Sequence, residues 1–139
     1  MIILDTNVLS EAFKPQPAES VLGWLATQAP SAVFTTTITL AEILNGIETL
    51  PPGRRRIRLS AAVEAMFRDQ FEGRILAFDE DAARQYSRIA ATRARVGRPI
   101  SQFDAMIAAI ARLHRAAVAT RDTADFEHCG VETIDPWVR

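Results

Sequence analysis

The chain has 139 residues, with 16 basic and 17 acidic side chains and a formal net charge of −1. Hydrophobic residues make up 48% and charged residues 24%, the ordinary mixture of a folded domain, which excludes extended disorder. The near-neutral charge also excludes a diffuse basic coat for nucleic acid, although it leaves room for a local basic rim around an acidic pocket.

Residues 1–13 predict a short strand that passes directly into a helix. Ile2, Ile3 and Leu4 form an apolar run typical of a buried strand in a parallel sheet. Asp5 ends that run, and apolar residues recur at helical spacing after it. We therefore expect Asp5 at the carboxyl end of a central strand, where α/β folds place their ligands. The alternative is that Asp5 only caps the following helix.

The rest of the chain alternates between predicted helices and strands. Further strands are expected at residues 32–35, 75–78, 116–120 and 131–134, and helices around residues 21–25, 39–47, 54–71, 81–90 and 102–114. We expect Ile57 and Ala61 of the long helix, and Phe103 of the last helix, to be buried. This alternation predicts one three-layer α/β/α domain over residues 1–139, with a parallel sheet of four or five short strands.

One cysteine, Cys129, excludes an internal disulfide and fits a reducing cytoplasm. The first apolar run is too short for a signal peptide, and no stretch approaches the length of a membrane span. We therefore expect a cytoplasmic protein without membrane attachment.

Four acids occur near predicted strand ends. Asp5 follows the first strand, Glu42 lies in the first turn of the helix after the second, and Asp104 lies in the first turn of the helix before the fourth. Asp122 follows that fourth strand by two residues. Because all strands of a parallel sheet point the same way, these side chains could meet above one edge.

Four converging carboxylates would repel one another strongly unless a cation joined them. A ligand set of oxygens without histidine is what Mg²⁺ or Mn²⁺ prefers. Such a cluster can hold a water molecule as nucleophile and steady a scissile phosphate.

Each acid also has a structural alternative. Residues 39–42 match a capping box, in which Glu42 would only reach back to the backbone amide of Thr39. Ser101 and Asp104 form nearly the same pattern. Taken singly, each acid fits a helix cap better than a metal ligand, whereas the recurrence of four acids favours a site.

The order of these motifs resembles the PIN domain, and most closely the VapC toxins of bacterial toxin–antitoxin pairs in their FitB-like branch. The segments that carry the resemblance are residues 2–7, Glu42, residues 104–109, residues 120–126 and the closing residues 135–137. The resemblance covers the whole chain in order.

The resemblance implies a Mg²⁺-dependent endoribonuclease, with Mn²⁺ as a possible substitute. The catalytic and metal-binding acids of the family fall on Asp5, Glu42, Asp104 and Asp122, and its supporting polar positions fall on Thr6, Asn7, Thr120 and Asp125. Many relatives carry asparagine where this chain has Asp122. The implied partners are RNA, a small cognate antitoxin, a second copy of the chain, and DNA only through the antitoxin.

Arginines close before Asp104 are candidates for a basic rim that guides RNA. These are Arg93, Arg95 and Arg98. The denser run at residues 54–58 is more typical of a solvated helix face. No glycine-rich phosphate loop is present, which excludes the common nucleotide-cofactor enzymes.

The sequence therefore predicts metal-dependent hydrolysis of RNA. Asp5, Asp104 and Asp122 would hold the metal, and Glu42 would either join them or orient the attacking water. Two alternatives stay open. The chain could act mainly by completing a DNA-binding repressor complex with an antitoxin, or it could be a housekeeping RNA-processing nuclease of the same fold.

Overall fold

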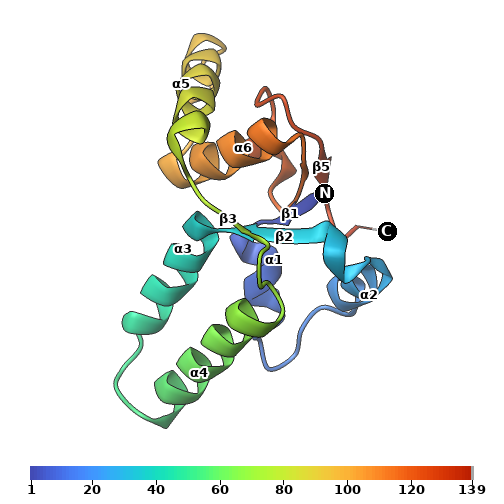
Figure 1. The fold of residues 1–139 in the computed structure, drawn as a ribbon, viewed down its shortest axis with the longest axis vertical. Coiled ribbons are helices and arrows are strands. Elements are labelled where there is room, and N and C mark those ends of the chain that lie inside the picture. Colours follow the sequence, from blue (N-terminus) through green and yellow to red (C-terminus); the bar gives the residue numbers. More distant parts are fainter. Residues whose placement is uncertain (139) are drawn as a thin grey trace.

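The strand β1 (Ile2–Leu4) lies at the centre of a parallel sheet with the strand order β3-β2-β1-β4-β5. The computed structural model describes residues 1–138 (Figure 1). The other strands are β2 (Val33–Thr36), β3 (Ile75–Leu76), β4 (Ala117–Ala119) and β5 (Thr133–Ile134). The helices are α1 (Thr6–Glu11), α2 (Glu19–Thr27), α3 (Thr37–Glu48), α4 (Arg54–Asp69), α5 (Glu80–Arg95) and α6 (Gln102–His114), with single 3₁₀ turns η1 (Pro30–Ala32) and η2 (Thr123–Phe126).

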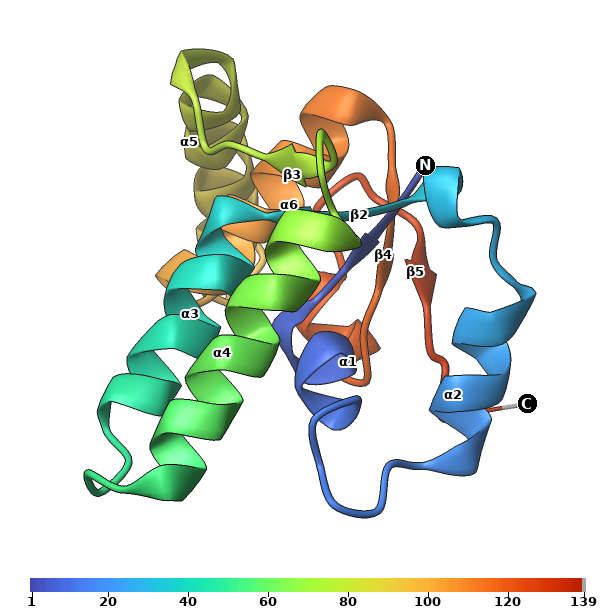
Figure 2. The ribbon, with the colours of Figure 1, turned by 60° about the horizontal axis from the view of Figure 1, so that its bottom comes forward.

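Successive strand residues point to opposite faces of the sheet and so divide the core in two. Ile3 and Val118 pack on one face with α5, α6 and η2, whereas Leu4 and Val33 pack on the other with α1, α3 and α4. Figures 1 and 2 show these two helix layers on either side of the short strands, with α3 and α4 side by side. The predicted three-layer α/β/α fold with a parallel sheet of short strands is confirmed.

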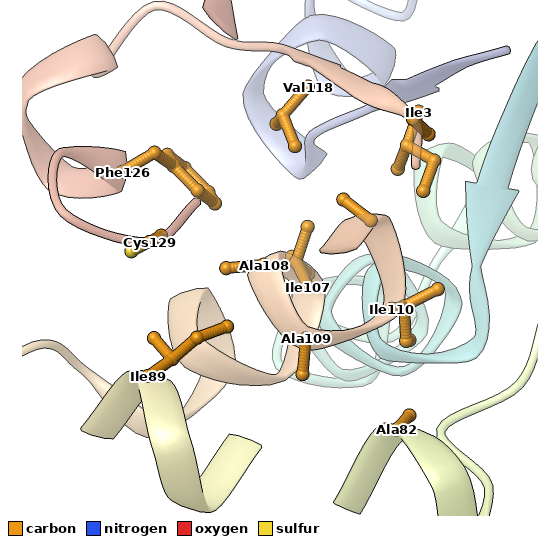
Figure 3. Close-up of a cluster of buried hydrophobic side chains, with 12 residues drawn as sticks. Ile3, Ala82, Ile89, Ile107, Ala108, Ala109, Ile110, Val118, Phe126 and Cys129 are labelled. Atoms are coloured by element: carbon orange, nitrogen blue, oxygen red, sulfur yellow. The ribbon is translucent and has the colours of Figure 1, made fainter. Parts of the chain in front are cut away.

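Small side chains allow α6 to pack close to the sheet and to α5. Ala105, Ala108, Ala109 and Ala111 are fully or almost fully buried. Figure 3 shows two of these alanines between the sheet residues Ile3 and Val118 and the helix α5. This close packing fixes the start of α6, which carries Asp104, relative to the sheet.

Three hydrophobic residues that the sequence predicts to be buried are exposed in the structure. Ile57 is 69% exposed and Ala61 is also exposed, because they share a face of α4 with the exposed Glu64, whereas Val63 lies on the buried face. Phe103 is 52% exposed. It lies in the first turn of α6, at the edge of the sheet where the strands end, and little of the core extends over it.

None of the helices within residues 1–138 combines the length and the apolar character needed to span a membrane.

The chain leaves β1 and β4 toward opposite faces of the sheet. After β1 it enters α1, which packs with the α3 and α4 layer, and after β4 it enters η2, whose Phe126 packs with the α5 and α6 layer. Because β1 and β4 are neighbours, their carboxyl ends border a topological switch point, where open α/β sheets bind ligands.

Candidate active site

Asp5 lies at this switch point and is 5% exposed. Its Oδ1 accepts a hydrogen bond from the backbone amide of Thr6 at 2.8 Å, and its Oδ2 accepts one from the hydroxyl of Thr120 at 2.8 Å. Burial, with smaller contributions from the charges of Asp104 and Glu42, raises the pKa of Asp5 to about 6 despite these two hydrogen bonds. Asp5 is the N-cap of α1 as well as the central carboxylate, so the two interpretations of this residue are compatible.

Glu42 is not part of a capping box, so that alternative is wrong. The N-cap of α3 is Thr36, whose Oγ1 accepts a hydrogen bond from the amide of Thr39 at 3.0 Å. This earlier start places Glu42 in the second turn of α3, not in the first. Instead, Glu42 Oε1 accepts a hydrogen bond from the hydroxyl of Thr6 at 2.8 Å.

The environment of Glu42 is that of a partly buried acid near other acids. Burial raises its pKa, the Thr6 hydrogen bond lowers it, and the charge of Asp104 raises it. Within residues 1–138, its Oε2 accepts no hydrogen bond. This second oxygen is therefore available to a cation or to a water molecule.

Asp104 has a backbone that belongs to a helix cap and a carboxylate that faces other acids. Its amide donates to Oγ of the N-cap residue Ser101 at 3.2 Å, as the capping pattern predicts. Burial raises the pKa of the Asp104 carboxyl, the Ser101 hydroxyl lowers it, and the charges of Asp125 and Asp122 raise it. The cap thus accounts for the amide of Asp104, whereas its carboxylate forms no salt bridge among the described residues.

Asp122 is more exposed than the other three acids and is bonded to Asn7 in the first turn of α1. Its Oδ2 accepts a hydrogen bond from Nδ2 of Asn7 at 3.1 Å, and its amide donates to Oγ1 of Thr120 at 3.1 Å. The amide of Arg121 donates to Oδ1 of Asn7 at 3.3 Å. Asp122 occupies the N-cap position of η2, but its side chain makes no cap hydrogen bond.

Asp5, Glu42, Asp122 and three of the four supporting positions therefore form one hydrogen-bond network, and Asp104 acts on its acids through charge. Thr6 connects Glu42 to the end of β1, and Thr120 connects Asp5 to the segment of Asp122. Asp125, the fourth supporting position, is exposed and acts on Asp104 through its charge.

One member of the network was not predicted from the sequence. Thr39 is fully buried, and its Oγ1 lies 3.1 Å from Oγ1 of Thr6. The spacing of threonines at 36 and 39 before an acid at 42 is the signal that could have revealed it, because residues three apart share one face of a helix.

The donor chemistry of this network fits a hard divalent cation. None of the four acids forms a salt bridge within residues 1–138. Oxygen donors that raise one another's pKa values are the kind of ligand Mg²⁺ or Mn²⁺ takes. As the side chains stand, no three acidic, histidine or cysteine residues of the described chain converge closely enough to hold an ion. The carboxylates would therefore have to move toward a bound cation.

The proposed basic rim needs a correction at Arg93. This residue is 4% exposed, and its Nη1 donates to the carbonyl oxygens of Asp125 and Glu127 at 2.7 Å and 2.9 Å. A guanidinium used in this way cannot reach an RNA phosphate. Arg95 is exposed, and Arg98 is exposed and paired with Glu127, so these two stay candidates for the rim.

Comparison with known proteins agrees with the site and the fold. The sequence profile of the PIN domain matches residues 2–131. The chain belongs to the PIN-domain family. It is 40% identical over 137 residues to the VapC ribonuclease Y4jK of Sinorhizobium fredii, covering 99% of this chain and 98% of that protein. It is also 40% identical to the toxin FitB of Neisseria gonorrhoeae over 137 residues, covering 99% of each chain.

Solved structures of PIN-domain proteins give the same result. The structure of FitAB bound to the IR36 DNA fragment contains a chain with a TM-score of 0.95 and 40% identity, and the match covers 100% of this chain and 97% of that one. The DNA-bound VapBC of Salmonella typhimurium matches with a TM-score of 0.79 and 30% identity, over 97% of both chains. The resemblance to VapC and to the FitB branch is confirmed.

Proposed function

We propose that this PIN-domain protein is a metal-dependent endoribonuclease and the toxin of a toxin–antitoxin pair. The observation that carries the proposal is the buried Asp5 carboxylate, which lies within electrostatic range of Asp104 and Glu42 and forms no salt bridge among residues 1–138. An arrangement that raises the pKa of a buried acid is costly to the fold, and it marks functional sites more often than structural ones.

The residues of the site have different proposed roles. Asp5, Asp104 and Asp122 would hold the cation, and Thr120 and Asn7 keep Asp5 and Asp122 in fixed orientations through their hydrogen bonds. Glu42 would join the cation or orient the attacking water with its free Oε2. When bound, Mg²⁺ or Mn²⁺ would supply activation of water and neutralisation of the charge that develops on the phosphate.

Cleavage of RNA by the purified chain tests the nuclease. We expect single-stranded or loop RNA to be cut with Mg²⁺ or Mn²⁺ and to survive in EDTA. Asp104→Asn should reduce cleavage by orders of magnitude, whereas Asp81→Asn, which changes an exposed acid of α5, should leave it unchanged. Cleavage that persists after thorough chelation would reject the metal-dependent mechanism.

An apolar groove beside the acids supports an antitoxin as the partner. It has a volume of about 360 Å³ and lies between α1, α3 and α4, with Ile43, Ile47 and Leu59 among its apolar walls. Thr6 and Glu42 line the part of the groove near the sheet, because α3 begins there and runs away from it. An antitoxin segment could place a helix in the groove and an arginine against the carboxylates.

Gly46 offers a selective test of this groove. It lines the groove on α3, and a Cβ added there would meet nothing within 4 Å. Gly46→Phe should therefore fold and cleave RNA, yet escape inhibition by the co-encoded antitoxin. Gly46→Ala is the matched control and should stay inhibited. If Gly46→Phe is inhibited as well as the wild type, the antitoxin binds elsewhere.

Growth experiments test the biological role. We expect expression of the chain alone to stop growth and co-expression of a small neighbouring gene product to restore it. Strong expression without any effect on growth or bulk translation would contradict the toxin assignment and favour a housekeeping nuclease.

A second role is supported by two similar structures, in which FitAB and VapBC are bound to DNA. We propose that this chain also forms a homodimer and joins its antitoxin in a DNA-bound complex. A gel-shift assay with promoter DNA, antitoxin and chain tests this role. The antitoxin alone should bind more weakly than the complex, and equal binding would argue against it.

A further inference from the structure

Arg93 is a buried cation that no carboxylate neutralises directly. It lies in the last turn of α5 and forms no salt bridge within residues 1–138. Its partners are backbone carbonyl oxygens, including those of Asp125 and Glu127, and the sulfur of Cys129 at 3.9 Å. Burying a guanidinium is unfavourable unless it is hydrogen-bonded, so these bonds determine where the surrounding segments can lie.

On one side, Arg93 closes the turn that leads into α6. Its Nε donates to the carbonyl oxygen of Arg98 at 2.5 Å, and the amide of Arg98 donates back to the carbonyl oxygen of Arg93 at 2.9 Å. Gly97 allows this turn with a φ of 73°. The turn is followed by Ser101, the N-cap of α6, and by Asp104 in its first turn.

On the other side, Arg93 holds the segment that carries Asp122. The carbonyl oxygen of Asp125 accepts from Arg93, and the amide of Asp125 donates to the carbonyl oxygen of Asp122 at 3.0 Å. Asn7 holds the side chain of Asp122 from the direction of β1. Asp122 is thus fixed between Asn7 in the first turn of α1 and Arg93 in the last turn of α5.

We propose that Arg93 is a positioning residue that fixes the segments of Asp104 and Asp122 relative to each other and thereby sets the affinity of the acidic site for a divalent cation. This inference rests on the proposed function of that site. The positive charge of Arg93 also acts on Asp104, whose pKa it lowers, although burial and the neighbouring acids raise that pKa overall.

Only arginine has the geometry that this role needs. Its Nε and Nη1 donate in fixed directions to Arg98 on one side and to the η2 segment on the other. A lysine carries the same charge on a single ammonium group and cannot keep both sets of bonds. Arg93→Lys therefore breaks the simultaneous hydrogen bonds to Arg98 and to the η2 segment while retaining the positive charge.

The test compares Arg93→Lys with two controls in the full chain. Ile89→Val trims a buried apolar residue one turn earlier on α5, and Arg84→Gln removes exposed ion pairs within the same helix. The melting temperature is followed as Mg²⁺ is added, and hydrogen–deuterium exchange of residues 122–127 is followed in EDTA. For Arg93→Lys we expect faster exchange and an increase of about tenfold in the half-saturating Mg²⁺ concentration, the size of effect typical of groups that orient metal ligands. Both controls should stay within about twofold of the wild type.

Two results would overturn the inference. If Arg93→Lys has a lower melting temperature but keeps the wild-type Mg²⁺ dependence, Arg93 only stabilises the fold, as Ile89 does. If exchange of residues 122–127 is unchanged, the hold on this segment is absent. A wild-type chain that does not respond to Mg²⁺ or Mn²⁺ would reject the proposed function itself, and with it the inference about cation affinity.

Discussion

The buried carboxylate of Asp5 should make the metal-free protein less stable as the pH rises toward neutrality. Its pKa is 3.8 for an ordinary carboxyl and about 6 in the fold. The unfolded chain therefore loses this proton at a lower pH than the folded chain does. For an acid with a raised pKa, stability is greatest below the ordinary value and falls as the pH rises through the folded value.

The pKa of Asp5 sets the size of this effect. Ionising Asp5 in the folded protein costs about 3 kcal/mol at neutral pH, and about 1–1.5 kcal/mol of this appears between pH 5 and pH 7. Asp69 and Glu127 have lowered pKa values because of hydrogen bonds from Arg68 and Arg98, so their contributions change at lower pH. Glu42 and Asp104 also have raised pKa values and add a loss of the same sign, so the contribution of Asp5 is the difference between the wild type and Asp5→Asn.

Asp5→Asn should remove the part of this pH dependence that Asp5 causes, without recovering the full stability of about 3 kcal/mol. The hydroxyl of Thr120 donates a hydrogen bond to Asp5. The same oxygen accepts hydrogen bonds from the amide of Asp122 at 3.1 Å and from Nδ2 of Asn7 at 3.4 Å. An amide at position 5 would add a third donor to that oxygen and remove the acceptor of its proton, a loss of about 1–3 kcal/mol. The slope with pH is thus a cleaner signal than the absolute stability.

The assay is urea denaturation in EDTA at several values between pH 5 and pH 7, for the wild type, Asp5→Asn and the exposed control Asp81→Asn. We expect the wild type and the control to lose about 1–1.5 kcal/mol across this range relative to Asp5→Asn. Saturating Mg²⁺ should reduce or reverse the loss, because the cation favours the ionised carboxylate. Parallel curves for all three proteins in EDTA would refute the assignment of an uncompensated charge to Asp5.

Three further substitutions should separate ligand, cap and packing effects. Asp104→Asn should keep or raise the melting temperature in EDTA and reduce the increase in melting temperature that Mg²⁺ gives. A variant that melts at a lower temperature and responds normally to Mg²⁺ would show that Asp104 is only a helix cap. Thr35→Val should raise the free energy of unfolding by about 1 kcal/mol in urea, because Thr35 Oγ1 is buried without a hydrogen-bond partner among the described residues. Gly46→Ala should stabilise the chain by about 0.5–1 kcal/mol, because Gly46 lies in a helix with open space at its Cβ; a loss of stability would mean that α3 is distorted there.

The sequence predicted those features that depend on local patterns. The apolar residues of β1 and the acid that follows them give both the strand and the position of Asp5, because a buried parallel strand needs a continuous apolar run and ends at the first charge. Ser101 is a correctly predicted N-cap for the same reason, since its hydroxyl bonds within three residues.

Features that depend on competing local patterns or on tertiary contacts were not predictable. Two threonines, Thr36 and Thr39, are suitable N-caps for α3, and only the end of β2 decides in favour of Thr36. That choice moves Glu42 out of the first turn. Arg93 looks like an ordinary cation at a helix C-terminus, but carbonyl groups more than thirty residues further along the chain bury it.

The acids of the site come from both layers of the protein. Glu42 belongs to α3, which packs on one face of the sheet, whereas Asp104 and Asp122 belong to α6 and to the segment before η2, which pack on the other. Asp5 lies between the two cores at the end of β1. A cation held by these acids would therefore join the two cores at the edge of the sheet where the strands end. Binding energy spent in this way adds to the stability of the whole fold, so Mg²⁺ should raise the melting temperature of the entire chain in one cooperative transition and not merely order the loops around the site.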